Sequence, residues 1–518
     1  MTYDKRTIRF ITGGLLLGLI LASIDQTIVS TAMPSVTKEL GGLGMYSWVF
    51  SVYMLASTTS MPLYGKMADL FGRKKMYLLG LLLFLAGSLL CGLARDMTEL
   101  IAFRAVQGLG AGALMPIAFT IIADVYPPER IGKFQGLFSA VFAVSSVLGP
   151  AIGGLIVQEL DWGWVFFINL PIGIPAFLLV AYSLKEAKGT SRRSIDWAGA
   201  VTLCAAILSL LTGMVSIGDG QETAAGQNGL TSGTPWLLAA SVVFFALFLW
   251  IETKAQEPIL PLGLFKLPVI AFGNLAGFFV SAGLFSAIAY IPLYAQGVIG
   301  ASPSASGYLL TPLMLATVVT SNLGGHLMSK VSYRAILMPS LATMAVGFLL
   351  LSWIPADSSL FLLILVLIVI GLGMGAVYPT LGTAAVRAVE PVNRGVATSS
   401  SQFFRSIGGT IGVSVTGSLL ARKLSAEAGN VTDALHAEQM QHFAGAQTLL
   451  DAAARASLPP DVLIALRQAL GHSLQMVFLL GFVFVCISLL ATFFLGKARL
   501  LPIAVPKSGS DEQSAQDS

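Results

Sequence analysis

The sequence predicts an all-α integral membrane protein with fourteen transmembrane helices, arranged as two six-helix bundles with two helices inserted between them. Fourteen apolar stretches of about 20 to 27 residues are each long enough to cross the ~30 Å hydrocarbon core of a bilayer as a helix. The chain is 55% hydrophobic and only 11% charged, with a mean hydropathy of +0.81. This composition excludes a water-soluble protein. Short motifs of the first half also recur in the second half.

The apolar stretches define the predicted spans and, from them, the domains. The spans cover residues 8–31, 45–66, 76–94, 99–124, 131–157, 162–184, 195–217, 235–252, 268–296, 305–330, 333–354, 358–386, 396–421 and 471–496. The predicted domains are a first bundle at 1–190, two inserted helices at 191–260, a second bundle at 261–497 and a tail at 498–518. The tail consists largely of Ser, Asp, Glu and Gln, so we expect a disordered cytoplasmic segment.

Basic residues indicate the orientation in the membrane. Most of the 30 Lys and Arg residues fall in loops on the same side as the N-terminus, and the positive-inside rule then places both termini in the cytoplasm. The net charge of +4 arises from these loops and does not indicate nucleic-acid binding. The first span resembles a signal peptide in its flanking charges, but it is longer than a usual signal and contains Asp25.

The cysteines and two of the histidines predict no metal or redox site. Cys91, Cys204 and Cys486 lie in separate spans with no ligand spacing, and we interpret them as core residues. Residues 422–470 are rich in Ala, Gln and Glu around Pro459–Pro460, and they predict an external helical hairpin. His436 and His442, six positions apart, do not share a helical face, which makes a metal site unfavourable.

An internal repeat predicts the two bundles. The segment GAGALMP begins at Gly110, and GMGAVYP begins at Gly373, 263 positions later. Gly65 opens the loop after the second span, and Gly325 opens a degenerate copy 260 positions later. Duplicated halves are typical of secondary transporters, which hold a midplane site between two bundles. The alternative is chance similarity among Gly-rich helices.

Two charges inside the predicted spans form the candidate coupling site. Asp25 is the only carboxylate well inside a span, and Arg104 lies in the middle of the fourth span. A buried arginine costs roughly 2.5 to 3.5 kcal/mol on insertion scales, so we expect it to pair with Asp25. A buried carboxylate beside an arginine is suited to carrying a proton. The alternative is that Asp25 is a helix-end residue near the outer surface.

The first cytoplasmic loop carries a family motif. Residues 65–75 read GKMADLFGRKK, and Gly65, Asp69, Gly72 and Arg73 resemble the loop 2–3 signature of the major facilitator superfamily. The resemblance implies a cytoplasmic latch, in which Asp69 caps a neighbouring helix and Arg73 pairs with a carboxylate such as Asp124. The alternative is a basic loop with no gating role.

Further motifs resemble the fourteen-helix drug:proton antiporter family of this superfamily, and together they cover essentially the whole chain. They are LASIDQTIVSTAMP at 21–34, RAVQGLGAGA in the fourth span, WGWVFFINLPIG at 162–173, SIDWAG at 194–199 and SQFFRSIGGTIG at 401–412. The fifth span carries SSVLGPAIGG, which resembles the antiporter motif through Gly149, Pro150, Gly153 and Gly154. It predicts a bent, tightly packed helix at the interface of the halves. Ser145 and Gly163 stand where the family usually has glycine and arginine.

The resemblance implies proton-coupled efflux of amphipathic drugs, dyes or lipophilic cations across the bacterial cytoplasmic membrane by alternating access. No GxxxxGK[ST] motif occurs, so we expect a proton gradient rather than ATP as the driving force, with no cofactor and no enzymatic activity. The expected partners are small amphipathic substrates, protons and the lipid bilayer, with no nucleic acid, and the protein is expected to be a monomer. Two alternatives are an exporter of a dedicated metabolite, siderophore or lipid, and a receptor or scaffold without transport.

Substrate-lining residues are predicted by residue type, since aromatic, Met and polar side chains near the midplane suit loose recognition of flat apolar compounds. The candidates are Gln26, Tyr53, Gln107, Met115, Asn274, Phe279, Tyr290, Tyr294, Tyr378, Gln402, Phe404 and Arg405. The alternative for each is core packing or lipid contact. Because spans ten and thirteen contain no carboxylate, we expect one principal proton site and a preference for monovalent lipophilic cations or neutral amphiphiles.

Overall fold

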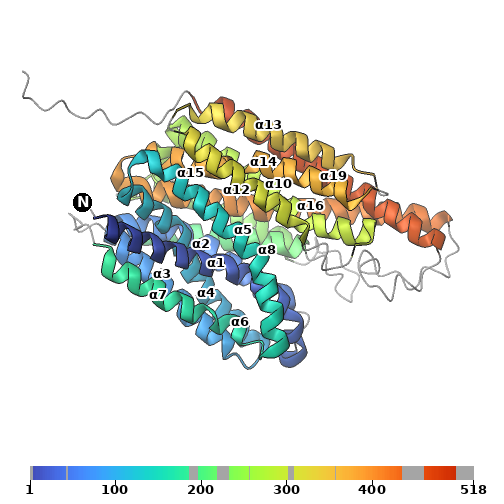
Figure 1. Ribbon diagram of the computed structural model, residues 1–518, viewed down its shortest axis with the longest axis horizontal. Coiled ribbons are helices and arrows are strands. Elements are labelled where there is room, and N and C mark those ends of the chain that lie inside the picture. The colour runs from blue at the N-terminus through green and yellow to red at the C-terminus, as the bar shows by residue number, and fades with distance from the viewer. Residues whose placement is uncertain are drawn as a thin grey trace, which may run out of the picture.

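The computed structural model describes residues 4–41, 45–185, 196–218, 233–255, 257–301, 308–328, 330–355, 358–434 and 460–496, and these form an all-helical bundle (Figure 1). The first half consists of α1 (Lys5–Leu40), α2 (Tyr46–Phe71), α3 (Arg73–Gly92), α4 (Met97–Val125), α5 (Pro128–Glu159), α6 (Trp164–Phe167) and α7 (Asn169–Ser183). The inserted helices are α8 (Trp197–Gly218) and α9 (Thr234–Glu252).

The second half has a matching set of helices. It consists of η2 (Leu262–Lys266), α10 (Pro268–Tyr294), η3 (Ala295–Ile299), α12 (Leu310–Leu327), α13 (Tyr333–Ser352), α14 (Leu360–Met374), α15 (Val377–Arg387), η4 (Pro391–Asn393), α16 (Arg394–Ala434) and α19 (Pro460–Phe493). α14 and α15 occupy one predicted span. The helix is interrupted at Gly375 and Ala376, just before Pro379, which has no N–H to donate within a helix.

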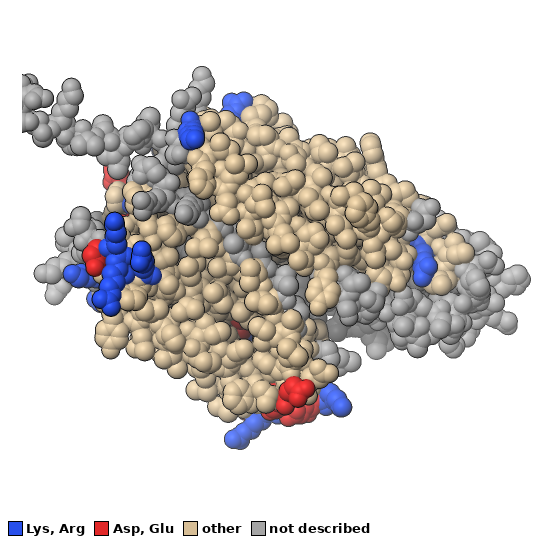
Figure 2. Space-filling view, in the orientation of Figure 1, with Lys and Arg blue, Asp and Glu red and all other residues tan. Residues whose placement is uncertain are grey.

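Ten segments of the described chain are long and apolar enough to cross a membrane. The four other predicted spans coincide with α2, α5, α12 and α16. These four also join the halves, since α2 packs on α16 and α5 packs on α12. The total of fourteen spans therefore stays a prediction, while the helices themselves lie where the apolar stretches do. Charged side chains lie mainly at the two ends of the molecule, and its middle carries almost none on the face in Figure 2.

Three long helices extend beyond their predicted spans. α16 continues to Ala434 and α19 begins at Pro460, so both ends of the predicted hairpin at 422–470 are helical extensions of the flanking spans. The centre of the hairpin, with His436 and His442, and the tail at 498–518 lie outside the described residues. α1 continues to Leu40, which places Asp25 well inside the helix rather than near its end.

The internal sequence repeat corresponds to equivalent contacts between helices in the two halves. A Cβ on Gly108 of α4 would lie 2.6 Å from the carbonyl oxygen of Tyr53 on α2. In the second half, Gly371, 263 positions later, meets the carbonyl oxygen of Leu313, 260 positions after Tyr53. Glycine at both sites lets the two backbones touch. The offsets are those of the sequence repeat, so each half packs this helix pair in the same way.

The two halves meet at one end of the bundle. Two basic segments, Lys66–Lys75 and Arg387–Arg394, lie at this end, which we call the basic end. Thr120 Oγ1 donates to Thr398 Oγ1 at 3.2 Å near this end. Deeper in the bundle, the hydroxyls of Thr58 and Ser406 are 2.7 Å apart. Toward the opposite end the halves diverge (Figure 1). The structure is therefore a conformation joined at the basic end.

Candidate functional site

The predicted ion pair between Asp25 and Arg104 lies in the interior of the first half. Arg104 Nη1 is 2.6 Å from Asp25 Oδ2, and the two residues are 1% and 0% exposed. Asp25 is therefore buried inside the first half and is not a helix-end residue. The pair joins α1 to α4 because each helix supplies one of the two charges.

Further donors surround the carboxylate of Asp25. Gln107 Nε2 donates to Asp25 Oδ1 at 2.7 Å, and Asn169 Nδ2 donates to the same oxygen at 3.2 Å. Both amides also reach Ser88 Oγ, at 2.7 and 3.1 Å. From the sequence, Gln107 was predicted only as a substrate-lining residue, and Asn169 and Ser88 were not predicted. The position of Asn169 within the motif WGWVFFINLPIG was the available signal for that residue.

Aromatic rings cover the arginine of this pair. The guanidinium carbon of Arg104 lies 4.2 Å from the ring centroid of Tyr53 and 5.8 Å from that of Phe166. Such contacts favour a desolvated cation. We call Asp25, Arg104, Gln107, Asn169 and Tyr53 the Asp25 network.

The Asp25 network has a definite chemical capacity. An ionised carboxylate can only accept hydrogen bonds, and here both oxygens accept from N–H donors. The ion pair and these hydrogen bonds therefore hold α1 against α4 and α7 through a single carboxylate.

A second polar cluster joins the halves at the basic end. Asp69 accepts from the backbone N–H groups of Gly395 and Val396, both at 3.0 Å. These residues open α16 in the other half, so Asp69 caps that helix N-terminus as predicted. Arg73 Nη2 donates to Asp69 Oδ1 at 3.4 Å and to the carbonyl oxygen of Pro391 at 2.7 Å.

Asp124 holds the same interface from α4. It forms an ion pair with Arg73, the predicted partner, and its Oδ1 is 3.0 Å from Nη1 of Arg394. Sequence reasoning missed Arg394, which had appeared only as one of the cytoplasmic basic residues. We call Asp69, Arg73, Asp124 and Arg394 the latch cluster.

Glycines allow the close approach on which the latch cluster depends. A Cβ on Gly395 would lie 2.5 Å from the carbonyl oxygen of Gly65 and 2.6 Å from Asp69 Oδ1. Gly72 has φ +102°, a conformation that other residues rarely adopt, and it turns the chain directly from α2 into α3. The predicted latch residues are thus in contact with the second half, while their gating role stays a prediction.

The helix of the antiporter-type motif, α5, packs on α12 of the second half as predicted, but its glycines contact a different helix. A Cβ on Gly149 would lie 2.9 Å from Thr27 Cβ, and one on Gly153 would lie 2.9 Å from Ile28 O. Both glycines therefore face α1 of the same half rather than the second half. Nothing lies within 4 Å of a Cβ on Gly154, so that glycine is not needed for close packing. The side chain of Pro150 lies outside the described residues.

The substrate-lining candidates divide into several environments. Gln26 is exposed beside Asp25, and Met115 packs on the core of the first half. Tyr294 is a core residue because its hydroxyl donates to the carbonyl oxygens of Ile354 and Pro355 at 3.1 and 2.9 Å. A substrate-lining role for this buried tyrosine, which packs on Phe478, is not supported.

The other candidates of the second half lie on or beside α16. Asn274 Nδ2 donates to Ser400 Oγ at 3.0 Å, and the Tyr290 hydroxyl donates to Val413 O at 3.3 Å. Three groups of three side chains complete this set, namely Phe279 of α10 beside Phe278 and Phe484, Phe404 beside Phe265 and Phe403, and Arg405 with Gln402 and Tyr378.

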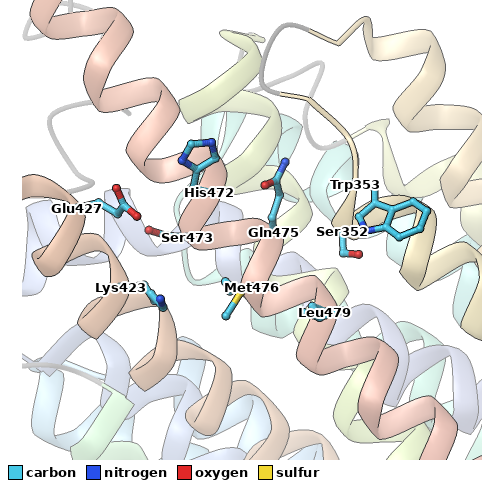
Figure 3. A pocket seen from close by; sticks show the side chains of 9 residues that line it. All are labelled: Ser352, Trp353, Lys423, Glu427, His472, Ser473, Gln475, Met476 and Leu479. Carbon is cyan, nitrogen blue, oxygen red and sulfur yellow. The ribbon is translucent and has the colours of Figure 1, made fainter.

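A separate cavity of about 320 Å³ lies at the opposite end, between the extensions of α16 and α19 (Figure 3). Ser352, Trp353, Lys423, Glu427, His472, Ser473, Gln475, Met476 and Leu479 line it. It is distant in sequence from the Asp25 network, and none of the predicted site residues lines it.

Two related helical halves that are joined at one end by a polar cluster, with a buried ion pair inside one half, are typical of secondary transporters. The chain belongs to the Major Facilitator Superfamily, whose family model matches residues 15–413. It is 38% identical to the multidrug transporter protein MdtP of Bacillus subtilis over 521 residues, which covers 96% of this chain and 94% of that relative. It is 36% identical to multidrug resistance protein 3 of the same organism, with 96% and 97% covered.

Solved structures have the same fold. The human organic anion transporter MFSD10 superposes with a TM-score of 0.60 at 17% identity, covering 92% of this chain and 99% of that chain. The proton:xylose symporter XylE gives 0.56 at 16% identity, covering 95% and 96%. At such identities the likeness establishes the fold alone. The chain is thus a transporter of this superfamily with multidrug efflux relatives.

Proposed function

We propose that the protein exports amphipathic drugs and dyes across the bacterial cytoplasmic membrane in exchange for protons, as a member of the fourteen-helix drug:proton antiporter family. The Asp25 network carries this proposal. A completely buried carboxylate is paired with a buried arginine in a helical membrane bundle, and intramembrane ionisable residues of this kind mark proton and substrate pathways. The multidrug names of the two bacterial relatives support the substrate class.

The proposed cycle uses the two polar clusters in alternation. The basic end is cytoplasmic by the positive-inside rule, with both termini on that side, so the present conformation faces outward. A proton from outside binds Asp25, releases Arg104 and favours release of the substrate. The latch cluster then separates, and Asp25 loses its proton to the cytoplasm while a new substrate binds. A potential of about 100 mV contributes ~2.3 kcal/mol for each charge moved.

The test is transport by the purified protein in liposomes under an imposed pH gradient. We expect ethidium movement coupled to proton flux in the native chain and loss of both in Asp25→Asn. Asp96→Asn is the matched control, because Asp96 caps α4 through Glu99 N at 2.8 Å and lies outside the network. Full coupled transport in Asp25→Asn would contradict the proposed coupling. Absence of any dye movement in the native chain would favour a dedicated metabolite or lipid exporter.

A further inference from the structure

The second half contains one charge deep within its predicted spans. Its six spans include no Asp or Glu, and Arg405 lies 11 residues after Arg394, where α16 begins. At 1.5 Å per residue this places Arg405 roughly 16 Å from the helix start, near the middle of a ~30 Å hydrocarbon layer. Arg104 of the first half has Asp25 as its counter-ion. The predicted spans of the second half offer no corresponding carboxylate to Arg405.

Uncharged side chains make the polar contacts of this arginine. Arg405 Nη2 donates to the side-chain carbonyl of Gln402, and its guanidinium carbon lies 4.5 Å from the ring centroid of Tyr378. The Tyr378 hydroxyl is 2.7 Å from Ser281 Oγ, which fixes the ring. Gly277 makes room for the arginine, because a Cβ there would lie 3.2 Å from Arg405 Cγ. The site is therefore built to hold a cation that nothing in this half neutralises.

Two neighbouring donors of this site lack acceptors. Arg405 Nε and Gln402 Nε2 are both buried with no hydrogen-bond partner in the described part of the chain. Gln402 itself is only 6% exposed. A buried unpaired N–H group is costly, and the cost is removed by an oxygen that accepts from it. An uncompensated guanidinium beside a free amide is the donor arrangement that suits a carboxylate or sulfonate.

We propose that Arg405 and Gln402 bind an anionic oxygen group where the exported compound carries one, so that amphipathic acids and zwitterions are bound more tightly than cations of the same shape. This inference rests on the export function proposed above and differs from the sequence-based expectation of lipophilic cations. The charge balance of the two halves explains the difference. The Asp25 network is electrically neutral as a pair, whereas the site at Arg405 is positive, and a purely cationic substrate gains nothing there.

The test compares two dyes that differ in a single group. Rhodamine 110 carries a free carboxylate, and rhodamine 123 is its methyl ester. We expect the native protein in detergent to bind the acid more tightly by fluorescence polarisation. Arg405→Gln should weaken binding of the acid by about 10- to 100-fold, the equivalent of losing one charge-assisted hydrogen bond. The ratio of acid to ester affinity should fall with it, and Arg405→Lys should give an intermediate ratio.

Arg334→Gln is the matched control, because Arg334 stacks on Phe493 at 4.8 Å, away from this site. It should leave the ratio unchanged. Equal affinity of the native protein for acid and ester, or an equal loss of both in Arg405→Gln, would overturn the inference. Transport in liposomes separates the two proposals: proton-coupled movement of the ester alone would preserve the export function and refute the anion site. Binding of neither dye would refute both.

Discussion

Replacement of Asp69 by alanine should separate the halves at the basic end. In the joined conformation the Asp69 carboxylate accepts from the first free N–H groups of α16, on Gly395 and Val396. Asp69→Ala removes this cap only from the joined conformation, because separation of the halves already breaks both hydrogen bonds. The substitution therefore acts on the conformational equilibrium rather than on folding alone.

The size of the shift follows from the capping interaction. An N-cap side chain contributes about 0.5 to 2 kcal/mol through its hydrogen bonds. Asp69 accepts two of them, so we expect a loss of about 2 kcal/mol. At 1.4 kcal/mol per factor of ten, the ratio of joined to separated molecules should fall roughly 30-fold.

The assay is a distance measurement across the basic end by pulsed electron paramagnetic resonance in lipid nanodiscs. Spin labels at Phe71→Cys and Val392→Cys suit it, because these side chains are 42% and 43% exposed and lie on opposite halves. The native cysteines are first replaced by serine, namely Cys91, Cys204 and Cys486. Asp69→Ala should add a longer distance to the distribution.

Asp96→Ala controls for the loss of any capping aspartate, since Asp96 caps α4 within its own half. It should lower thermal stability by about 1 kcal/mol without changing the distance distribution. An unchanged distribution in Asp69→Ala would refute the reasoning. The same would hold if Asp96→Ala produced an equal shift.

Three further outcomes are expected. Gly373→Ala should cost about 1 to 3 kcal/mol of stability in thermal unfolding, because its Cβ would lie 2.6 Å from Met344 Cα, whereas Gly154→Ala should be nearly neutral. Burial raises the pKa of Asp69 to about 6 in the joined conformation, against the opposing effect of its arginine neighbour. Since the joined state then binds a proton more tightly than an opened one, lowering the pH from about 7.5 to about 5 should increase the joined population in the spin-label assay, and Asp69→Asn should abolish this response. Arg394→Gln should open the same contact less than Asp69→Ala, because its ion pair is partly exposed and worth about 1 kcal/mol or less; a larger opening would contradict that ranking.

The sequence was sufficient to predict features that depend on neighbouring residues along the chain or on the cost of burying a charge. Apolar stretches located the helices, and the cost of a charge in lipid was enough to pair Asp25 with Arg104. The repeat offset also anticipated equivalent contacts, such as those of Gly108 and Gly371. Each of these inferences needs only chain spacing or a large energetic penalty.

Other features depend on which helix face meets which neighbour, and the sequence did not reveal them. Asn169 joins the Asp25 network from a helix 144 positions away, as one polar residue among several near midspan. The motif helix α5 lies at the interface of the halves as expected, where it packs on α12, but its Gly149 and Gly153 face α1 of the same half. A glycine-rich face predicts close packing without naming the partner. Arg394 was counted as a positive loop charge, and only the fold brings it to Asp124.

The modest apolar character of α2, α12 and α16 has a consequence for how the protein enters the membrane. α2 contains the run Ser57 to Ser60 and α16 contains Ser399 to Ser401. The two helices pack on each other in the finished molecule, with the hydroxyl of Thr58 on that of Ser406. Segments with many hydroxyl side chains partition weakly into lipid when they leave the translocon alone. We therefore expect the most apolar spans to insert into the membrane first. The interface helices should insert stably only when a neighbouring helix is present for them to pack against. The surfaces that later slide past each other during transport are thus the last to be secured during biogenesis.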